Sequence, residues 1–191
     1  MRFLYILIFS AALASANESV YSEVKSIISI MESSNKHTVV NRNGFLGKYQ
    51  FGAMSLVDIG FLKLENYRAL TYTKKTKTRA AKVMWRDGYN LTKFLDDPNN
   101  WNIEGGKQAF LNSVELQDKA MDTMLRINTK RLLQKGFNLD DPSFAKSMLI
   151  ASHFGGVGSA EKYATEHKDY KDDFGTSISK YYNARKGHYN P

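Results

Sequence analysis

Glu32 is the residue best placed for acid–base chemistry, because its carboxyl group stands where an apolar side chain is expected. The apolar residues before it recur at spacings of three and four, which predicts an amphipathic helix: Val20, Val24, Ile27, Ile28 and Met31. Glu32 falls on the stripe of Val24 and Ile28, where burial would disfavour its charged form and raise its pKa, as a general acid requires. The alternative is that the helix ends here and Glu32 turns to solvent or caps a loop amide.

A second group of polar and aromatic residues follows in the segment Gly-Lys-Tyr-Gln-Phe-Gly at positions 47–52. Gln50 could hydrogen-bond a sugar amide or hydroxyl, or it could satisfy local backbone groups. Tyr49 and Phe51 offer ring faces for stacking on a sugar, although either could belong to the core. We expect only one of the two rings to line a cleft. Ser33 could hydrogen-bond the Glu32 carboxylate or a substrate, or it could cap the helix.

A third segment, Ala-Ser-His-Phe-Gly-Gly-Val-Gly-Ser-Ala, covers positions 151–160. No predicted strand precedes its glycines and no Gly-Lys-Ser/Thr follows, so a nucleotide-binding loop is not expected. Gly155 instead suggests close backbone approach to a glycan. His153 could orient a substrate or be a satisfied wall residue. The chain has no cysteine and its four histidines lack a paired spacing, so we expect no metal site, no disulfide and no cofactor.

In their order along the chain, these segments resemble the signature of the lysozyme-like lytic transglycosylases. In that family a glutamate followed by serine comes at a helix end, a Gly-x-Met-Gln loop lines the sugar cleft, an Ala-Tyr-Asn-x-Gly segment forms the far wall, and a late tyrosine approaches the glutamate. The matching positions are Glu32 with Ser33, Gly47 with Gln50, Ala151 with Gly155, and Tyr181 or Tyr182, of which Tyr181 is preferred. Two departures, Tyr49 for methionine and Ser152-His153 for tyrosine and asparagine, look like a phage-lysin or wall-lysozyme branch.

The resemblance implies a mainly α, lysozyme-like α+β fold with a small hairpin or irregular β region beside the catalytic cleft. It also implies cleavage of the β-1,4 bond between N-acetylmuramic acid and N-acetylglucosamine in peptidoglycan. Hydrolytic glycosidases normally use two carboxylates, whereas a lytic transglycosylase uses one glutamate as acid and then as base. Glu32 has no partner with comparable context, since the other candidates occupy polar settings: Asp58, Asp87, Asp96, Asp97 and Glu104. A hydrolytic muramidase, or a non-catalytic wall-binding or secretion-apparatus protein on the same fold, remains the alternative.

The N-terminus predicts export. An apolar run over residues 3–14 follows Met1-Arg2 and ends in Ala14-Ser15-Ala16, as in a secretory signal peptide covering residues 1–16. The run is short for a membrane anchor. We therefore expect a periplasmic or secreted protein with one catalytic domain over residues 17–191, acting as a monomer.

The formal net charge of +8 favours anionic partners. We expect peptidoglycan strands rather than nucleic acid. The basic residues from Lys74 to Arg79, with Lys82, could contact an anionic wall or membrane surface, or they could form a solvated helix face. Residues 74–87 are predicted to be a helix with Ala80, Ala81, Met84 and Trp85 inward. The other expected elements are an irregular or hairpin region at 35–52, helices at 53–59, 141–152 and 159–166, a long helix capped by Asn112 and ended by Gly136, and a final helix after Thr176 or Ser177.

Overall fold

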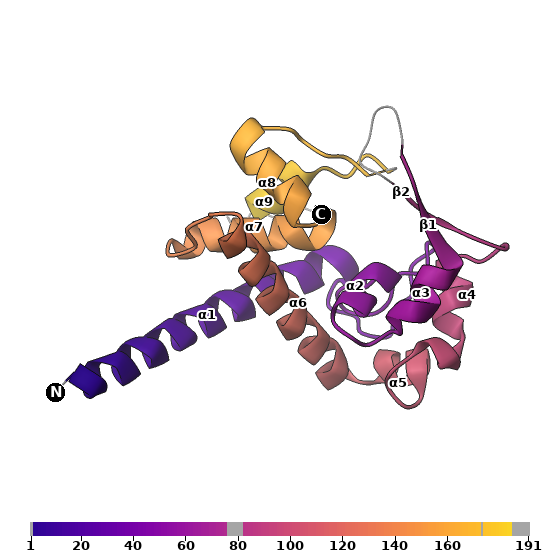
Figure 1. The fold of residues 1–191 in the computed structure, drawn as a ribbon, viewed down its shortest axis with the longest axis horizontal. Helices are drawn as coiled ribbons and strands as arrows, with labels where there is room; N and C mark the ends of the chain where they lie inside the picture. The colour runs from indigo at the N-terminus through magenta and orange to yellow at the C-terminus, as the bar shows by residue number, and fades with distance from the viewer. Residues whose placement is uncertain (1, 76–81, 173, 185–191) are drawn as a thin grey trace. The chain divides into compact units, whose positions relative to one another are not determined.

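The computed structural model describes residues 2–75, 82–172 and 174–184, with side chains from residue 18 onward. This part of the chain is mainly helical and contains one two-stranded antiparallel sheet (Figure 1). The α-helices are α1 (Arg2–Ser33), α2 (Ala53–Asp58), α3 (Leu64–Leu70), α4 (Leu91–Asp96), α5 (Gly106–Asn112), α6 (Val114–Gln134), α7 (Pro142–Gly155), α8 (Val157–Glu166) and α9 (Ile178–Asn183). The strands are β1 (Thr71–Lys74) and β2 (Lys82–Trp85), and a 3-10 turn, η1, covers Pro98–Asn100. Among the helices of the described segments, none is long and apolar enough to cross a membrane.

The chain divides into two compact units. One comprises Met1–Met31 together with Leu125–Pro191, and the other comprises Glu32–Met124. Helices α1 and α6 each contribute residues to both units. The expected single catalytic domain over residues 17–191 stays a prediction.

In the unit that contains both chain ends, α7 packs against α8 and α9. The Tyr21 hydroxyl of α1 lies 2.8 Å from the hydroxyl of Thr129 on α6. The buried residues of α7 form a nearly continuous apolar stretch that includes Met148, Leu149 and Ile150. This helix therefore forms much of the core of its unit.

The core of the other unit is aromatic. Phe110 of α5 lies at the centre of a cluster of rings, 5.9 Å from Phe51, 5.9 Å from Phe61 and 5.8 Å from Trp101 between ring centroids. All four rings are buried. The segment between α1 and α2 is irregular, as predicted, and is held by isolated bridges from Leu46 to Val40 and to Phe51.

The prediction of a basic helix over residues 74–87 is wrong. Thr71 pairs with Trp85 and Lys74 with Lys82 in an antiparallel hairpin. Trp85 packs edge-on against Tyr67 at 5.9 Å and lies 5.3 Å from Phe94, contacts that its place on one face of a strand allows. The β-branched and aromatic residues favour a strand over a helix here. The predicted inward positions Ala80 and Ala81 lie outside the described residues.

Several predicted helix ends are confirmed. Asp141 caps α7 by accepting a hydrogen bond from the Ser143 amide, and Gly136 follows α6 with a left-handed φ of +86°. Ser177, rather than Thr176, caps α9. The expected Asn112 cap is displaced by one residue, because Asn112 ends the short helix α5, which the sequence analysis did not predict.

Ser113 is therefore the capping residue of α6, since its hydroxyl accepts a hydrogen bond from the Leu116 amide at 3.1 Å. We expect Ser113→Ala to lower the free energy of unfolding by about 1 kcal/mol. Asn112→Ala should have a much smaller effect. Urea unfolding of the two variants checks the position of the cap, and a larger loss in Asn112→Ala would contradict it.

Candidate functional site

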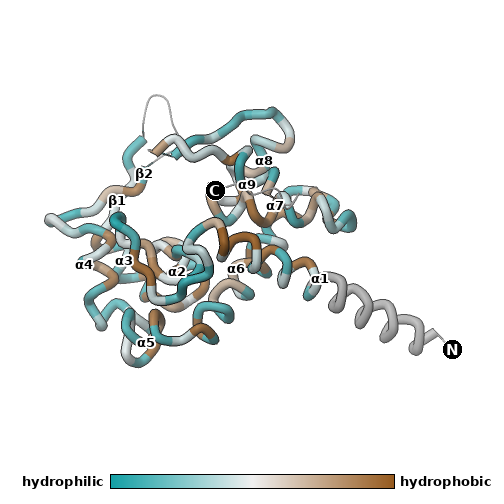
Figure 2. The backbone as a smooth tube through the Cα atoms, turned by 180° about the vertical axis from the view of Figure 1, so that it is seen from behind, coloured by the Kyte–Doolittle hydropathy of each residue, from teal (hydrophilic) through white to brown (hydrophobic). Residues whose placement is uncertain are grey.

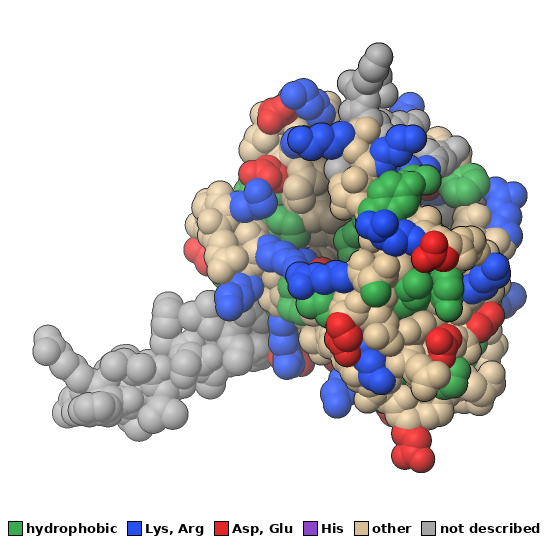
Figure 3. All heavy atoms as spheres, turned by 45° about the vertical axis from the view of Figure 1, so that its right-hand side comes forward, with side chains coloured by type: hydrophobic (Ala, Val, Ile, Leu, Met, Phe, Trp, Pro, Cys, Tyr) green, Lys and Arg blue, Asp and Glu red, His purple; other side chains and the backbone are tan. Residues whose placement is uncertain are grey.

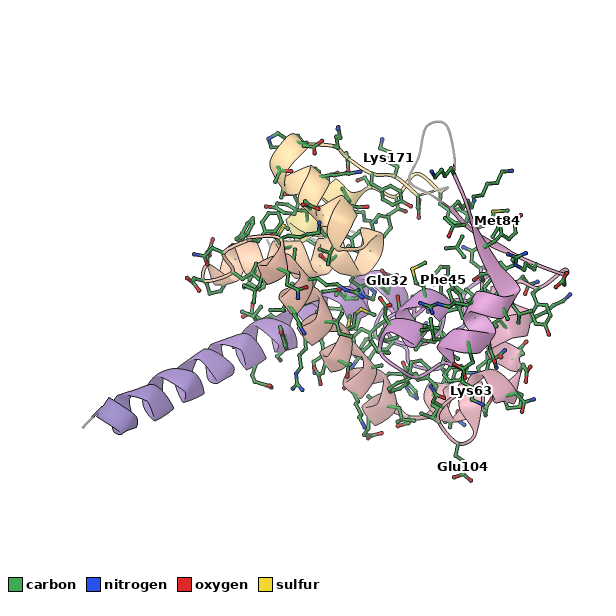
Figure 4. The ribbon with its side chains drawn as sticks, in the orientation of Figure 1. Glu32, Phe45, Lys63, Met84, Glu104 and Lys171 are labelled. Atoms are coloured by element: carbon green, nitrogen blue, oxygen red, sulfur yellow. The ribbon has the colours of Figure 1, made fainter. Side chains whose placement is uncertain are left out.

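Glu32 is the penultimate residue of α1 and is half-buried (Figure 4). Val24 and Ile28, the residues two turns and one turn before it, are fully buried, so the predicted apolar stripe is confirmed. Ser34 and Asn35 follow the helix with left-handed φ values of +52° and +65°, which ends α1 directly after Ser33. The carboxyl group thus stands where the buried stripe meets an irregular loop.

Ser33 connects this helix end to the segment 47–52. Its hydroxyl donates a hydrogen bond of 2.8 Å to the Lys48 carbonyl and accepts one of 3.1 Å from the Lys36 amide. The capping role that the sequence left open is therefore present, and it is combined with a link to a residue fifteen positions away. Ser33, which follows Glu32 directly, therefore links the end of α1 to the loop that carries Gln50.

Gln117 of α6 holds the same loop through further hydrogen bonds. Its buried carboxamide accepts a hydrogen bond of 2.7 Å from the Lys48 amide and donates to the carbonyls of His37 and Phe110 at 3.0 and 2.9 Å. Gly47 has a φ of +75°, and a Cβ atom there would lie 2.3 Å from the side-chain amide oxygen of Gln117. Only glycine allows this close approach.

Gln50 has an unusual backbone and an incomplete set of hydrogen bonds. Its φ is +51°, and its side chain is only 8% exposed. The side-chain nitrogen donates a 2.8 Å hydrogen bond to the Gly47 carbonyl, but the side-chain oxygen is buried and has no donor among the described residues. A buried acceptor left unmet costs about 1–3 kcal/mol. Local backbone groups thus account for only one end of this amide.

Tyr49 and Phe51 are both core residues, each 1% exposed. The Tyr49 hydroxyl donates a 2.6 Å hydrogen bond to Asp118, while Phe51 packs edge-on against Tyr49 and Phe110. The prediction that one ring lines a cleft is wrong, because residues two apart on an extended segment share a face and both rings are buried. This placement favours the core role that the sequence left open for both rings.

Asp118 was not predicted, yet it is a second anchor of the loop. It accepts hydrogen bonds from the Tyr49 hydroxyl and from the Lys48 ammonium group, the latter at 3.1 Å. Burial, together with the adjacent Asp118 carboxylate, raises the pKa of Tyr49 well above its usual range. The sequence did offer one indication that this part of α6 holds a loop. Gln117, the residue before Asp118, is polar but lies one turn before Ala120 and Met121 on the buried face of the helix.

The remaining predicted site residues lie in the other unit. His153 and Gly155 are at the end of α7, and Tyr181 is on α9. A Cβ atom on Gly155 would lie 2.7 Å from the Ile178 side chain, so this glycine serves the packing of α7 against α9. Tyr181 is buried and its ring stacks on Phe154 at 4.3 Å, whereas Tyr182 packs against Tyr163. The unit therefore brings the last turn of α7 and Tyr181 together.

The other candidate carboxylates have structural settings. Asp96 pairs with Lys107 at 2.6 Å, and Asp97 caps η1 through the Asn99 amide. Asp58, Asp87 and Glu104 are exposed. Within the described ranges, no group of three histidine, aspartate or glutamate residues could hold a metal ion.

Loss of the Gln117 carboxamide should destabilise the protein. Gln117→Leu fills similar space but leaves the Lys48 amide and two carbonyls without their partner, so we expect the free energy of unfolding to fall by about 2–4 kcal/mol. Gln108→Leu, on an exposed position of α5, is the matched control. Urea unfolding measures both, and equal losses would contradict the assignment.

The raised pKa of Tyr49 predicts that the free energy of unfolding depends on pH. Its pKa is about 10 in the unfolded chain and raised in the folded protein, so above pH 10 only the unfolded state loses the proton. The stability advantage over Tyr49→Phe is therefore complete below about pH 9 and should shrink by about 1.4 kcal/mol by about pH 11. Urea unfolding of both proteins across this range tests it. An advantage independent of pH would contradict a buried, protonated Tyr49.

No family model, no curated protein and no solved structure matches this chain. The residues that bear on its function are the half-buried Glu32, the loop bonded to the neighbouring Ser33, and Gln50 with its unmet acceptor.

Proposed function

We propose that this protein is an exported peptidoglycan-cleaving enzyme with a lysozyme-like fold. In this proposal it breaks the β-1,4 bond between N-acetylmuramic acid and N-acetylglucosamine by lytic transglycosylation, with Glu32 as the catalytic residue. The observation that carries the proposal is the 2.8 Å hydrogen bond from Ser33 to the Lys48 carbonyl. It joins two segments that the resemblance pairs, the glutamate at a helix end and the glycine-bounded loop with Gln50.

Gln50 supports a binding role for this loop. Its side-chain oxygen is an acceptor without a donor among the described residues, while its nitrogen is held by Gly47. The oxygen is buried, so an N–H or O–H group of an N-acetylated sugar would reach it only if the Gln50 side chain turned outward on binding. Ser33 belongs to the same site as a positioning residue. Tyr49 and Phe51 support the loop from the core, and we assign them no stacking contact with the sugar.

Roles for His153, Gly155 and Tyr181 remain part of the proposal by resemblance. The Tyr181 ring is held by its stacking on Phe154, and Gly155 allows α9 to approach α7. By resemblance alone, we assign these three residues to substrate binding.

The settings of the carboxylates favour a reaction with a single acid. Asp118, the acid attached to the loop, already accepts hydrogen bonds from Lys48 and Tyr49. Asp96 and Asp97 are used in an ion pair and a helix cap. A hydrolytic mechanism would require a second carboxylate at a defined separation from Glu32. Transglycosylation requires only Glu32.

In the proposed reaction, the protonated Glu32 carboxyl donates its proton to the glycosidic oxygen as the bond from that oxygen to C1 of the muramic acid breaks. The carboxylate that results then accepts the proton of the 6-hydroxyl of the same sugar. That oxygen bonds to C1 and closes a 1,6-anhydro ring. The two proton transfers return Glu32 to its initial state without consuming water.

Glu32→Gln keeps the size of the side chain but removes the titratable proton. We expect it to lower the release of soluble muropeptides from purified peptidoglycan by at least about a hundredfold. Glu104→Gln, on an exposed loop, is the control and should retain activity. Circular dichroism and thermal unfolding establish that both variants fold. A folded Glu32→Gln protein that still digests the wall would refute the assignment.

Mass spectrometry of the products separates the alternatives. Anhydro-muramyl ends are expected for a transglycosylase. Reducing muramyl ends would instead identify a hydrolytic muramidase. Binding to intact sacculi without released fragments at any pH would identify a non-catalytic wall-binding protein.

A further inference from the structure

The positive charge of this protein is concentrated in one short segment. Seven of the 27 lysine and arginine residues lie between positions 66 and 86, where there is no aspartate or glutamate: Arg68, Lys74, Lys75, Lys77, Arg79, Lys82 and Arg86. The rest of the chain has the remaining 20 basic residues against all 19 acidic ones. Nearly all of the net charge therefore belongs to the segment that contains β1 and β2.

The register of the hairpin gives it two different faces. Thr71 pairs with Trp85 on the face where Trp85 contacts the rings of Tyr67 and Phe94. The opposite face carries the pairs Tyr72 with Met84 and Lys74 with Lys82. Figure 4 shows the Met84 side chain on the hairpin. In Figure 2, the backbone next to the grey trace of residues 76–81 is coloured hydrophilic. We call this second face the basic face of the hairpin.

Cations are fixed at both ends of the basic face. At its base, Arg86 donates a 3.2 Å hydrogen bond to the Thr71 carbonyl, and its guanidinium lies 5.1 Å from the centre of the Tyr72 ring. At the other end, Lys74 and Lys82 are direct cross-strand partners and both are exposed. The basic face therefore carries positive charge at each end.

The apolar part of the basic face is small. Tyr72 is 42% exposed, and Met84 is its only large apolar neighbour on this face, because Trp85 and Val83 belong to the other face. Figure 3 likewise shows apolar side chains interspersed with lysine and arginine on the surface that it presents. Insertion into a bilayer surface requires a broader continuous apolar face. The charge therefore fits a polymer strand better than a lipid surface.

We propose that the basic face of the β1–β2 hairpin binds a carboxylate-bearing polymer strand. This inference rests on the proposed function, in which that strand is the peptide-substituted glycan of the wall. Arg86 follows β2 opposite Leu70, four residues along the ladder from the Lys74–Lys82 pair. At about 3.4 Å per residue, the cations at the two ends of the face are about 14 Å apart, so they can meet separate anionic groups of one polymer strand. The hairpin would hold the polymer at a surface distinct from Glu32 and raise its local concentration.

The experiment measures binding to purified sacculi by co-sedimentation, with Glu32→Gln in every protein so that the polymer stays intact. The hairpin variant carries Lys74→Gln, Lys75→Gln and Lys82→Gln. The control carries Lys119→Gln, Lys130→Gln and Lys162→Gln, three exposed lysines elsewhere, and so loses the same net charge. We expect the hairpin variant to bind about tenfold more weakly and the control to change by less than about twofold. Equal losses in the two variants, or no loss in the hairpin variant, would overturn the proposal.

Three further probes identify the ligand chemistry. Poly-glutamate should compete with sacculi for the parent protein, and its own binding should weaken in the hairpin variant and at high salt, where screening shortens the range of charge interactions. Vesicles of phosphatidylglycerol and single-stranded DNA test the lipid and nucleic-acid alternatives. Hairpin-dependent binding to either of these, with sacculus binding unchanged in the hairpin variant, would overturn the proposal.

These measurements stay separate from the test of the proposed function. If poly-glutamate and sacculi bind through the hairpin but the protein with Glu32 intact releases no muropeptides, the hairpin proposal stands and the enzymatic proposal fails. If muropeptides are released and the hairpin variant binds sacculi normally, the enzymatic proposal stands and the hairpin proposal fails.

Discussion

The arrangement of the candidate site depends on how Lys48 is held. Its amide donates to Gln117, its carbonyl accepts from Ser33, and its ammonium group pairs with Asp118. Three contacts from two helices therefore fix one residue in the middle of an irregular loop. Because Gln117 is buried and also satisfies the carbonyls of His37 and Phe110, the loop cannot move without leaving buried backbone groups unpaired.

This rigid support explains how the loop tolerates Gln50. A left-handed backbone at a residue other than glycine and an unmet buried acceptor are both unfavourable, and such features persist only where the surroundings enforce them. The neighbours Tyr49 and Phe51 provide that enforcement, since one ring is anchored to Asp118 and the other packs on Phe110. Tyr49 and Phe51 therefore contribute to the site by holding the loop in the core, and not by contacting a ligand.

Local patterns predicted much of this structure. The buried stripe before Glu32, the Asp141 cap and the irregular segment between α1 and α2 all follow from spacing and residue type within a few positions. The hairpin was missed because its closely spaced lysines also suit a solvated helix face, and the Trp85 contacts that decide the matter come from Tyr67 and Phe94. Gln117 and Asp118 were missed because they contact residues about seventy to eighty positions away. Likewise, the sequence could not reveal the left-handed backbone of Gln50.

The distribution of charge separates two kinds of recognition. Lys48 is the only charged residue in the loop 47–52, and it pairs with Asp118, so the loop contributes little net charge to the site. By contrast, the segment 66–86, which contains the hairpin, carries seven basic residues and no acidic one. In the proposed function, the substrate has the same division, since uncharged sugar rings carry amide and hydroxyl groups and the attached peptides carry carboxylates. Salt should therefore weaken the capture of the polymer more than it affects the chemistry at Glu32, because screening acts on exposed charges and much less on buried hydrogen bonds.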